Sequence, residues 1–479
     1  MLESIPTAHQ NNRTTKKGVY HDNSPFGGVG SHFIDFHRRF SPIFQLRTKA
    51  INDVAEQYFK GLIQASKKNM ERMAEAVPDS NDQALQHFLT NSPWDEQLVV
   101  EQVAHDTNGL VGGRKNSCLL VDESGMPKKG KKSVGVSRQW CGQLGKTDNC
   151  QVGVYTTLCS GENYAPIGFR LYLPQNWVDD KARCKEAGIP DESIEFFTKP
   201  ELAIQLVIEA RMHGVEFEWI SVDSLYGKDA AFLRMMDQMD EVFMADVAKD
   251  QSIYLEDPDP VVPAPKSKKG RKPSKLKAQC EPMRVDKWAE QQPATRWKRT
   301  RVRDTTKGKL WVKILHQRVW LWDGEEANAH LWHLIVRRDP NGDLKYSLSN
   351  APSSTSCSRL AYMQAQRYWI ERNFQEAKNQ CGMGEYQARK WRSWHHHMAM
   401  VLMAMLFMLE QRLLFKDDYP LLSCFDIVCI LNFLLPRRAT TLEEVIRQLE
   451  ERHRRRQASI DYAYRKKLYA ELSKNEICF

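Results

Sequence analysis

The stretch "NSCLLVDESG", residues 116–125, reads as a short buried strand that ends in acidic residues. A second stretch, "FEWISVD" at residues 217–223, has the same form and ends at Asp223. Open α/β sheets bind their ligands at the carboxyl ends of their strands. The two stretches therefore predict an α/β fold in which Asp122 and Asp223 lie close together at one edge of a sheet, where a functional site would form.

The segments around these two strands predict a mixed sheet with flanking helices. Residues with strand-like alternation and turns rich in Gly and Asn form a meander at 133–142, 148–161 and 164–174. An amphipathic helix at 200–214, with Pro200 near its first turn, precedes the strand that ends at Asp223. A further helix and strand follow at 230–239 and 241–247. Antiparallel strands, a helix and then another strand describe an α/β core with mixed strand order.

The composition predicts a globular intracellular protein of more than one domain. The chain has 479 residues, of which 42% are hydrophobic and 27% charged. A net charge of +9 favours a polyanionic partner such as nucleic acid. Its 11 cysteines include no C-x-x-C pair, and the N-terminus has no secretory signal, which favours reduced thiols. The longest apolar run, 398–409, is shorter than the span of about 20 residues that a bilayer requires, so it predicts a buried core helix.

Composition and periodicity divide the chain into six parts. Residues 256–282 are rich in Pro and Lys and have no hydrophobic period, which predicts a linker, and β-type segments follow it. The predicted parts are a flexible N-terminus (1–42), a helical N-terminal domain (43–113), the first part of the α/β core (114–255), a basic linker with a β-rich insertion subdomain (256–350), the second part of the core (351–415) and a helical basic C-terminal region (416–479).

A third acidic residue lies on a predicted helix, "RYWIERNFQEAKNQCGMGEY" at residues 367–386. On a helical wheel, Arg367, Glu371 and Lys378 fall within about 40° of one another, at the edge of an apolar stripe. Such a row is either a solvated set of ion pairs or one third of an active site. The active site is favoured because Asp122 is followed by a run of lysines, and carboxylates beside lysines suit a metal site that meets phosphates.

The order strand-Asp, strand-Asp, helix-Glu matches the RNase H-like nucleotidyl-transfer fold. The sequence resembles a DDE transposase of the bacterial insertion-sequence class, in the Y-R-E-K branch, and is similar to insertion-sequence family seven-oh-one. The resemblance covers roughly residues 45–415 and is carried by "LQHFLTNSPWDEQ", "VDESGMPKKGKKSVGVSRQWCGQLGKTDNCQVGVY", "SVDSLYG" and "RYWIERNFQEAKNQCGMGEYQARKWRSWHHH". It implies an RNase H-like catalytic core interrupted by a β-rich insertion, and it implies that the helical N-terminal domain at 43–113 is a DNA-binding domain.

The signature of the branch, Tyr-x2-Arg-x3-Glu-x6-Lys, is met by Arg367, Glu371 and Lys378 in register. The tyrosine position is occupied by Gln364, while Tyr362 and Tyr368 are out of register. A competing assignment makes Glu376 the catalytic acid, because Arg372-x3-Glu376 satisfies the first half of the pattern. The lysine expected seven residues later is Met383, so Glu371 is the preferred assignment.

The resemblance also implies a chemistry and a set of residues. Asp122, Asp223 and Glu371 would be the catalytic carboxylates and the ligands of two Mg²⁺ (or Mn²⁺) ions per active site. Predicted DNA contacts are Arg367, Lys378, Lys128, Lys129, Lys131, Lys132, Lys268, Lys269 and Arg271. The branch often forms a hairpin intermediate in which a Trp of the β-insert holds a flipped base, and the candidates are Trp297, Trp311, Trp320, Trp322 and Trp332.

The implied substrate is double-stranded DNA, both the terminal inverted repeats of a transposon and its target, cut and rejoined by in-line phosphoryl transfer. The resemblance also implies a homodimer in a synaptic complex. The expected location is the bacterial cytoplasm, with association to the nucleoid through DNA and with no membrane. Two alternatives remain: a catalytically inactive or domesticated DNA-binding protein derived from a transposase, and an RNase H-like nuclease without strand transfer. The basic run at 452–456 fits either a DNA contact or a solvated helix face.

Overall fold

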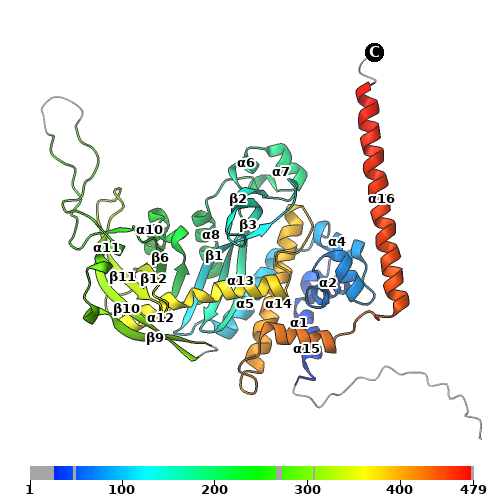
Figure 1. The fold of residues 1–479 in the computed structure, drawn as a ribbon, viewed down its shortest axis with the longest axis horizontal. Helices are drawn as coiled ribbons and strands as arrows, with labels where there is room; N and C mark the ends of the chain where they lie inside the picture. The colour runs from blue at the N-terminus through cyan, green and yellow to red at the C-terminus, as the bar shows by residue number, and fades with distance from the viewer. Residues whose placement is uncertain (1–25, 47–49, 266–271, 306–307, 476–479) are drawn as a thin grey trace, which may run out of the picture.

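The computed structural model describes residues 26–46, 50–265, 272–305 and 308–475. A ten-stranded sheet runs through the molecule with helices on both faces (Figure 1). The N-terminal helices pack at one end of this arrangement, and helix α16, Leu442–Asn475, projects from the body at the same end. The predicted mixed sheet with flanking helices is confirmed.

The strands of the sheet follow the order β2-β3-β1-β5-β6-β12-β11-β10-β9, and β4 pairs with β3. The first six strands are β1 Ser117–Pro127, β2 Ser137–Cys141, β3 Lys146–Ser160, β4 Asn163–Leu171, β5 Trp219–Val222 and β6 Phe243–Val247. Strand β1 is antiparallel to β3 and parallel to β5, which in turn is parallel to β6. The predicted meander and the two acid-terminated strands are therefore present.

Strand β1 is buried on both faces of the sheet. Cys118 and Leu120 belong to the hydrophobic cluster that includes the apolar residues of helix α14, whereas Leu119 and Val121 belong to the cluster that includes helix α8. A strand covered on both sides has no solvent face to mark with polar residues. This burial explains why the stretch before Asp122 is a continuous apolar run and not an alternating one.

Helices α8 and α10 lie on one face of the sheet, and α12, α13 and α14 lie on the other. Helix α8 begins with a capping box between Thr198 and Glu201 and has Pro200 in its first turn, as predicted. The bounds of these and the shorter helices are α6 Gln175–Val178, α7 Lys181–Ala187, α8 Lys199–Met212, α9 Ser224–Gly227, α10 Ala230–Gln238, α11 Val285–Glu290, α12 Cys357–Gln366, α13 Tyr368–Gln380 and α14 Trp391–Leu414.

The β-rich segment after the linker extends the core sheet. Its strands are β9 Lys298–Thr305, β10 Gly308–Leu321, β11 His330–Arg338 and β12 Leu344–Ser349, and β7 Ser252–Ile253 pairs separately with β8 Met283–Arg284. Strand β12 pairs antiparallel with β6, so that Ser347 lies opposite Asp246. The sequence predicts a subdomain here, whereas the structure has one continuous sheet, because β6 offers an edge whose backbone groups need partners.

Residues 29–40 form a helix, although they belong to the stretch that the sequence predicts to be a flexible N-terminus. Helix α1, Val29–Phe40, buries Val29, Phe33, Phe36 and Phe40, whose spacing of three and four places them on one face. Residues 1–25 lie outside the described residues. The helices that follow are α2 Asn52–Gln64, α3 Met70–Ala76, α4 Asp82–Thr90 and α5 Glu96–Val111.

In the described ranges, α14 is the one helix that is long and apolar enough to cross a membrane by length and composition. However, 78% of its most apolar window is buried inside the protein. All residues of the run 398–409 are buried, which confirms the prediction of a core helix. Helix α15, Cys424–Leu434, packs beside α14 and precedes α16.

Candidate active site

Two aspartates stand at the point where the parallel pairing of β1 and β5 ends. Val121 lies opposite Val222 in this pairing, so Asp122 and Asp223 follow aligned positions on neighbouring strands. The carboxylate of Asp223 also begins helix α9, since its Oδ1 accepts a hydrogen bond from the backbone N–H of Leu225 at 2.9 Å. The two acids that end the predicted strands therefore meet at one edge of the sheet.

A pocket of about 480 Å³ opens between this edge and helix α13. We call it the carboxylate pocket; its polar lining includes Asp122, Glu123, Asp223, Glu371, Trp140 and Lys378. Helix α13 packs across β1, β3 and β4 (Figure 1). Glu371 and Lys378 of this helix line the pocket together with Asp122 and Asp223. The structure thus brings together the three acids and the lysine that the sequence singles out.

The guanidinium of Arg367 lies among the carboxylates. Its Nη1 donates to Asp122 Oδ2 at 3.0 Å, its Nη2 donates to Glu371 Oε1 at 2.8 Å, and its Nε is 3.2 Å from Asp246 Oδ2. Burial lowers the pKa of Arg367, but the neighbouring carboxylates more than offset this and raise the pKa overall. The sequence predicts a phosphate contact for Arg367, whereas its donors here are committed to three carboxylates.

The two aspartates are short of compensating positive charge. Burial raises the pKa of Asp122 to about 7, with Arg367 lowering it and Asp223 raising it further. Burial likewise raises the pKa of Asp223, and the adjacent Glu123 adds to the rise. Closely spaced carboxylates with raised pKa values are the kind of group that a divalent cation stabilises.

A chain of hydrogen bonds supports Asp246, one of the three carboxylates that contact Arg367. The side chain of Gln364 donates from Nε2 to Ser347 Oγ at 2.7 Å, and Ser347 Oγ donates to Asp246 Oδ1 at 2.5 Å. Asp246 then contacts Arg367. Gln364, which replaces the tyrosine of the branch signature, is buried. Through Ser347 it supports Asp246, whose closeness to the site follows from the pairing of β12 with β6.

Glu376, the competing third acid, points to a different environment. Its Oε2 accepts hydrogen bonds from Tyr164 Oη at 2.9 Å and from Cys424 Sγ at 3.2 Å. In the described residues it does not line the carboxylate pocket, whereas Glu371 does. The side chain of Glu371 is 56% exposed and therefore open to a ligand.

Glu123 and Trp140 also line the pocket, although the set of site residues predicted from the sequence does not include them. Glu123 accepts hydrogen bonds from Lys199 Nζ at 2.9 Å and Tyr226 Oη at 3.2 Å. Trp140 is 58% exposed at the rim of the pocket. The alternation of β2 was an available signal, because it places Arg138 and Trp140 on the same exposed face.

The predicted lysines after Asp122 have different environments. Lys128 donates to the carbonyl of Tyr386 at 3.0 Å, and burial lowers its pKa to about 8. Lys132 pairs with Glu186 at 2.9 Å, and Lys129 and Lys131 are exposed. Three further predicted DNA contacts lie outside the described residues, namely Lys268, Lys269 and Arg271.

The tryptophans predicted to hold a flipped base lie in the β-rich segment. Arg338 stacks on Trp297 and Arg299 stacks on Trp311, at 4.0 and 4.7 Å from the ring centres. Trp320 is half-buried beside Tyr254, Trp322 donates to the carbonyl of Glu326, and Trp332 is buried. Among the residues that the structure describes, none of these tryptophans lines the carboxylate pocket, whereas Trp140 does.

The donor set fits Mg²⁺ or Mn²⁺ in its chemistry, since carboxylate oxygens are the ligands that hard cations prefer. In the described ranges, no three His, Cys, Asp or Glu side chains are close enough together to hold a metal ion. Asp122, Asp246 and Glu371 are arranged around the guanidinium of Arg367. In the structure, the positive charge between these three carboxylates is therefore the guanidinium of Arg367.

Comparison with known proteins adds two findings. The sequence model of the DDE superfamily endonucleases matches residues 39–309, a range that contains Asp122 and Asp223 and ends before Glu371. A probable transposase for insertion sequence element IS701 from Microchaete diplosiphon is 35% identical over 177 residues. The aligned part is 36% of this chain and 42% of that protein, so the chain spans less than half the length of this relative.

Proposed function

This chain belongs to the DDE superfamily of endonucleases, and from that membership we propose that it is an insertion-sequence transposase of the Y-R-E-K branch. Its catalytic core would be RNase H-like, with the β-rich segment as the insertion of that branch. The reaction would be metal-dependent cleavage of transposon ends followed by strand transfer into target DNA.

The observation that carries the proposal is the convergence of Asp122, Asp223 and Glu371 on one pocket. Two of these acids stand where the pairing of the adjacent parallel strands β1 and β5 ends, and the third lies on helix α13. Three carboxylates far apart in sequence, with a lysine beside them, fit phosphoryl transfer better than a purely structural role, because gathering several carboxylates around the single guanidinium of Arg367 is costly.

The proposed roles follow from where each side chain lies. Asp122, Asp223 and Glu371 would hold two Mg²⁺ or Mn²⁺ ions, which when bound activate the attacking oxygen and stabilise the leaving oxygen at phosphorus. Lys378, whose pKa is lowered by burial, would supply positive charge to a DNA phosphate in the pocket. Arg367 would fix the positions of Asp122 and Glu371 and limit their mutual repulsion.

The proposed substrate is double-stranded DNA, with a homodimer pairing two transposon ends in the cytoplasm. The chain's positive charge and its exposed lysines beside Asp122 favour a polyanion. The related transposase supports this choice of substrate.

A plasmid that carries this gene with its natural flanking DNA tests the proposal, because the flanks supply the ends whatever their sequence. We expect the full chain with Mg²⁺ to cut at the flanks and to join the freed 3′ ends to a second plasmid, and we expect EDTA to abolish both products. Cuts without joined products would identify a nuclease without strand transfer. DNA binding without cuts would identify a DNA-binding derivative, and either outcome would overturn the proposal.

Trp140 is expected to stack on a DNA base at the rim of the carboxylate pocket. Stacking of a base on an aromatic side chain contributes about 1–3 kcal/mol, so Trp140→Ala should weaken binding of single-stranded or nicked DNA by roughly tenfold. Fluorescence anisotropy with a labelled oligonucleotide measures the effect. Phe425→Ala is the matched control, because Phe425 is similarly exposed, at 60%, but lies on α15. An equal loss in both variants would contradict the assignment.

A further inference from the structure

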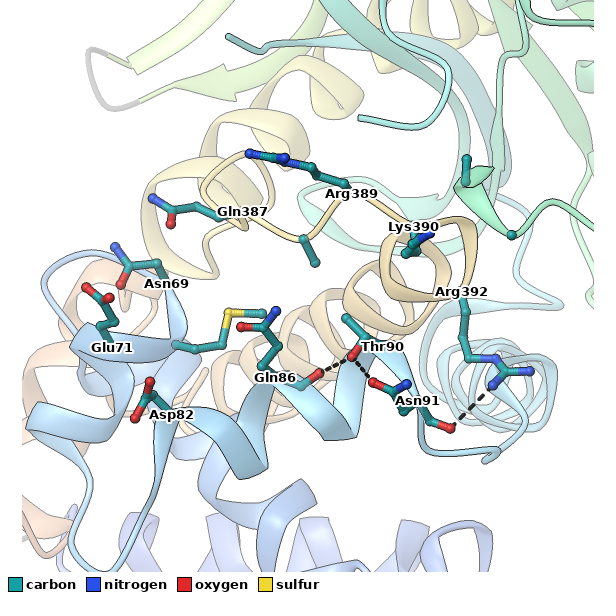
Figure 2. A pocket seen from close by; sticks show the side chains of 14 residues that line it. Asn69, Glu71, Asp82, Gln86, Thr90, Asn91, Gln387, Arg389, Lys390 and Arg392 are labelled. Carbon is teal, nitrogen blue, oxygen red and sulfur yellow. Dashed lines mark hydrogen bonds between the residues drawn. The ribbon is translucent and has the colours of Figure 1, made fainter. Parts of the chain in front are cut away.

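A second pocket, of about 790 Å³, lies between the N-terminal helices and the segment that links α13 to α14. We call it the α4 pocket, and its polar lining includes Asn69, Gln86, Asn91, Gln387, Arg389 and Arg392. Figure 2 shows Gln387 and Arg389 on one side of the pocket and Asn69 and Gln86 on the other. Neither the fold nor the proposed chemistry accounts for this set of amides and arginines.

The two arginines of the α4 pocket are available to a ligand. Arg389 and Arg392 are exposed, and in the described part of the chain neither guanidinium forms an ion pair. Arg392 makes one long hydrogen bond, at 3.4 Å, to the carbonyl of Asn91 (Figure 2). The side chains of Gln86 and Gln387 are also exposed and, within the described residues, have no hydrogen-bond partner.

Helix α16 removes a negative charge from the wall of this pocket. Asp82 lines the pocket, but both of its oxygens pair with Arg455, at 2.6 and 3.1 Å. Arg452 pairs with Glu75 at 3.0 Å in the same way. Glu71 is the remaining acid of the lining, so Arg389, Lys390 and Arg392 outweigh it. The pocket is therefore suited to an anion.

The α4 pocket is joined to the carboxylate pocket by a basic path. The lysine-rich loop 128–132 follows β1, the strand that carries Asp122, and the N–H of Val134 donates to the carbonyl of Arg389 at 2.9 Å. The ammonium groups of Lys132 and Lys390 both contact Glu186, one at its side chain and the other at its carbonyl. The loop after the first catalytic strand thus lies against the segment that supplies the arginines.

We propose that the α4 pocket binds the DNA duplex that extends from the carboxylate pocket. Arg389 and Arg392 contact backbone phosphates, because guanidinium groups form bidentate hydrogen bonds with phosphate. Gln86 and Gln387 face the base edges or sugars, since amide side chains both donate and accept hydrogen bonds. This inference rests on the proposed function, and it names the surface by which the DNA beside the cut is held.

Binding of a labelled duplex to the full chain at several salt concentrations tests the inference. We expect Arg389→Ala/Arg392→Ala to weaken binding by at least about tenfold and to make the slope of log Kd against log salt shallower by about 2, because two phosphate contacts are lost. The control is Lys249→Ala/Lys313→Ala, which removes two exposed positive charges after β6 and on β10. It should change binding by less than about twofold. Thermal unfolding of each variant verifies that it is folded.

A second pair of variants tests the role of α16. Arg455→Ala leaves Asp82 uncompensated and should weaken DNA binding several-fold, and adding Asp82→Asn should restore it. Unchanged affinity and salt slope in Arg389→Ala/Arg392→Ala would overturn the inference, as would an equal loss in the Lys249/Lys313 control. Both experiments measure DNA binding and not cleavage. If the wild-type chain cuts DNA but Arg389→Ala/Arg392→Ala binds DNA normally, only this inference is wrong, and the proposed function stands.

Discussion

Glu371→Gln is expected to lower Mg²⁺-dependent DNA cleavage by about a thousandfold, which corresponds to roughly 4 kcal/mol of lost transition-state stabilisation. Glutamine keeps the shape of the side chain but removes the negative charge that would hold a cation at the carboxylate pocket. Because Glu371 is 56% exposed and pairs only at one edge with Arg367, the fold should tolerate the change. The initial rate of cleavage of the flank-carrying plasmid measures the effect.

Glu376→Gln is the matched control on the same helix. Its carboxylate accepts hydrogen bonds from Tyr164 and Cys424, away from the two aspartates. Cleavage by this variant should stay within about threefold of the wild type, since glutamine can still accept the bond from Tyr164. Titration of Mg²⁺ or Mn²⁺ by calorimetry gives a readout independent of activity, with weaker binding expected for Glu371→Gln alone. Wild-type cleavage in Glu371→Gln would disprove the assignment of the third acid.

Arg367→Met is expected to lower the free energy of unfolding by about 3 kcal/mol. The substitution leaves Asp122 and Asp246 partly buried without their shared cation, and removal of one partner from a buried ion pair is strongly destabilising. Urea unfolding of wild type and variant at neutral pH measures the difference. Mg²⁺ should restore stability more in the variant than in the wild type, because a bound cation would replace part of the lost charge.

Arg372→Met provides the comparison for this prediction. Arg372 lies on the same helix, and its guanidinium is 3.4 Å from Glu376, with a hydrogen bond to Gln375 as its other contact. Its side chain is 39% exposed, so the loss should be less than about 1 kcal/mol. Equal destabilisation by the two substitutions would show that the contacts of Arg367 with the carboxylates contribute no more to stability than those of Arg372 do.

The strands and the helix of the site could be predicted because their signals are local. The runs before Asp122 and Asp223 are apolar because both faces of β1 and β5 are buried, and the spacing in 367–378 shows which residues share a helix face. The contact of Arg367 with Asp246 was not predictable in this way. It depends on β6 lying beside β5, and the support of Asp246 by Ser347 depends on β12 lying beside β6; no local pattern records which strands are neighbours.

Two other features could not be predicted from the sequence, for related reasons. The apolar spacing of helix α1 is present in the sequence, but the surrounding Gly, Asn and His residues suggest a polar tail, and only packing against the core gives the helix its stability. The α4 pocket combines side chains from α3 and α4 with side chains from the segment after α13, which lies far along the chain from both helices. Its charge also depends on Arg455, which reaches Asp82 from the C-terminal helix.

Helix α14 has a consequence for how the chain can be divided. Near one end, Trp394 packs edge-on against Phe169 of β4, and further along Phe407 packs edge-on against Phe33 of α1. The N-terminal helices and the sheet therefore share a single apolar interior, with α14 as its axis. Severing the chain between residues 113 and 114 would expose this interior on both fragments, so the N-terminal helices and the proposed catalytic core form one cooperative folding unit.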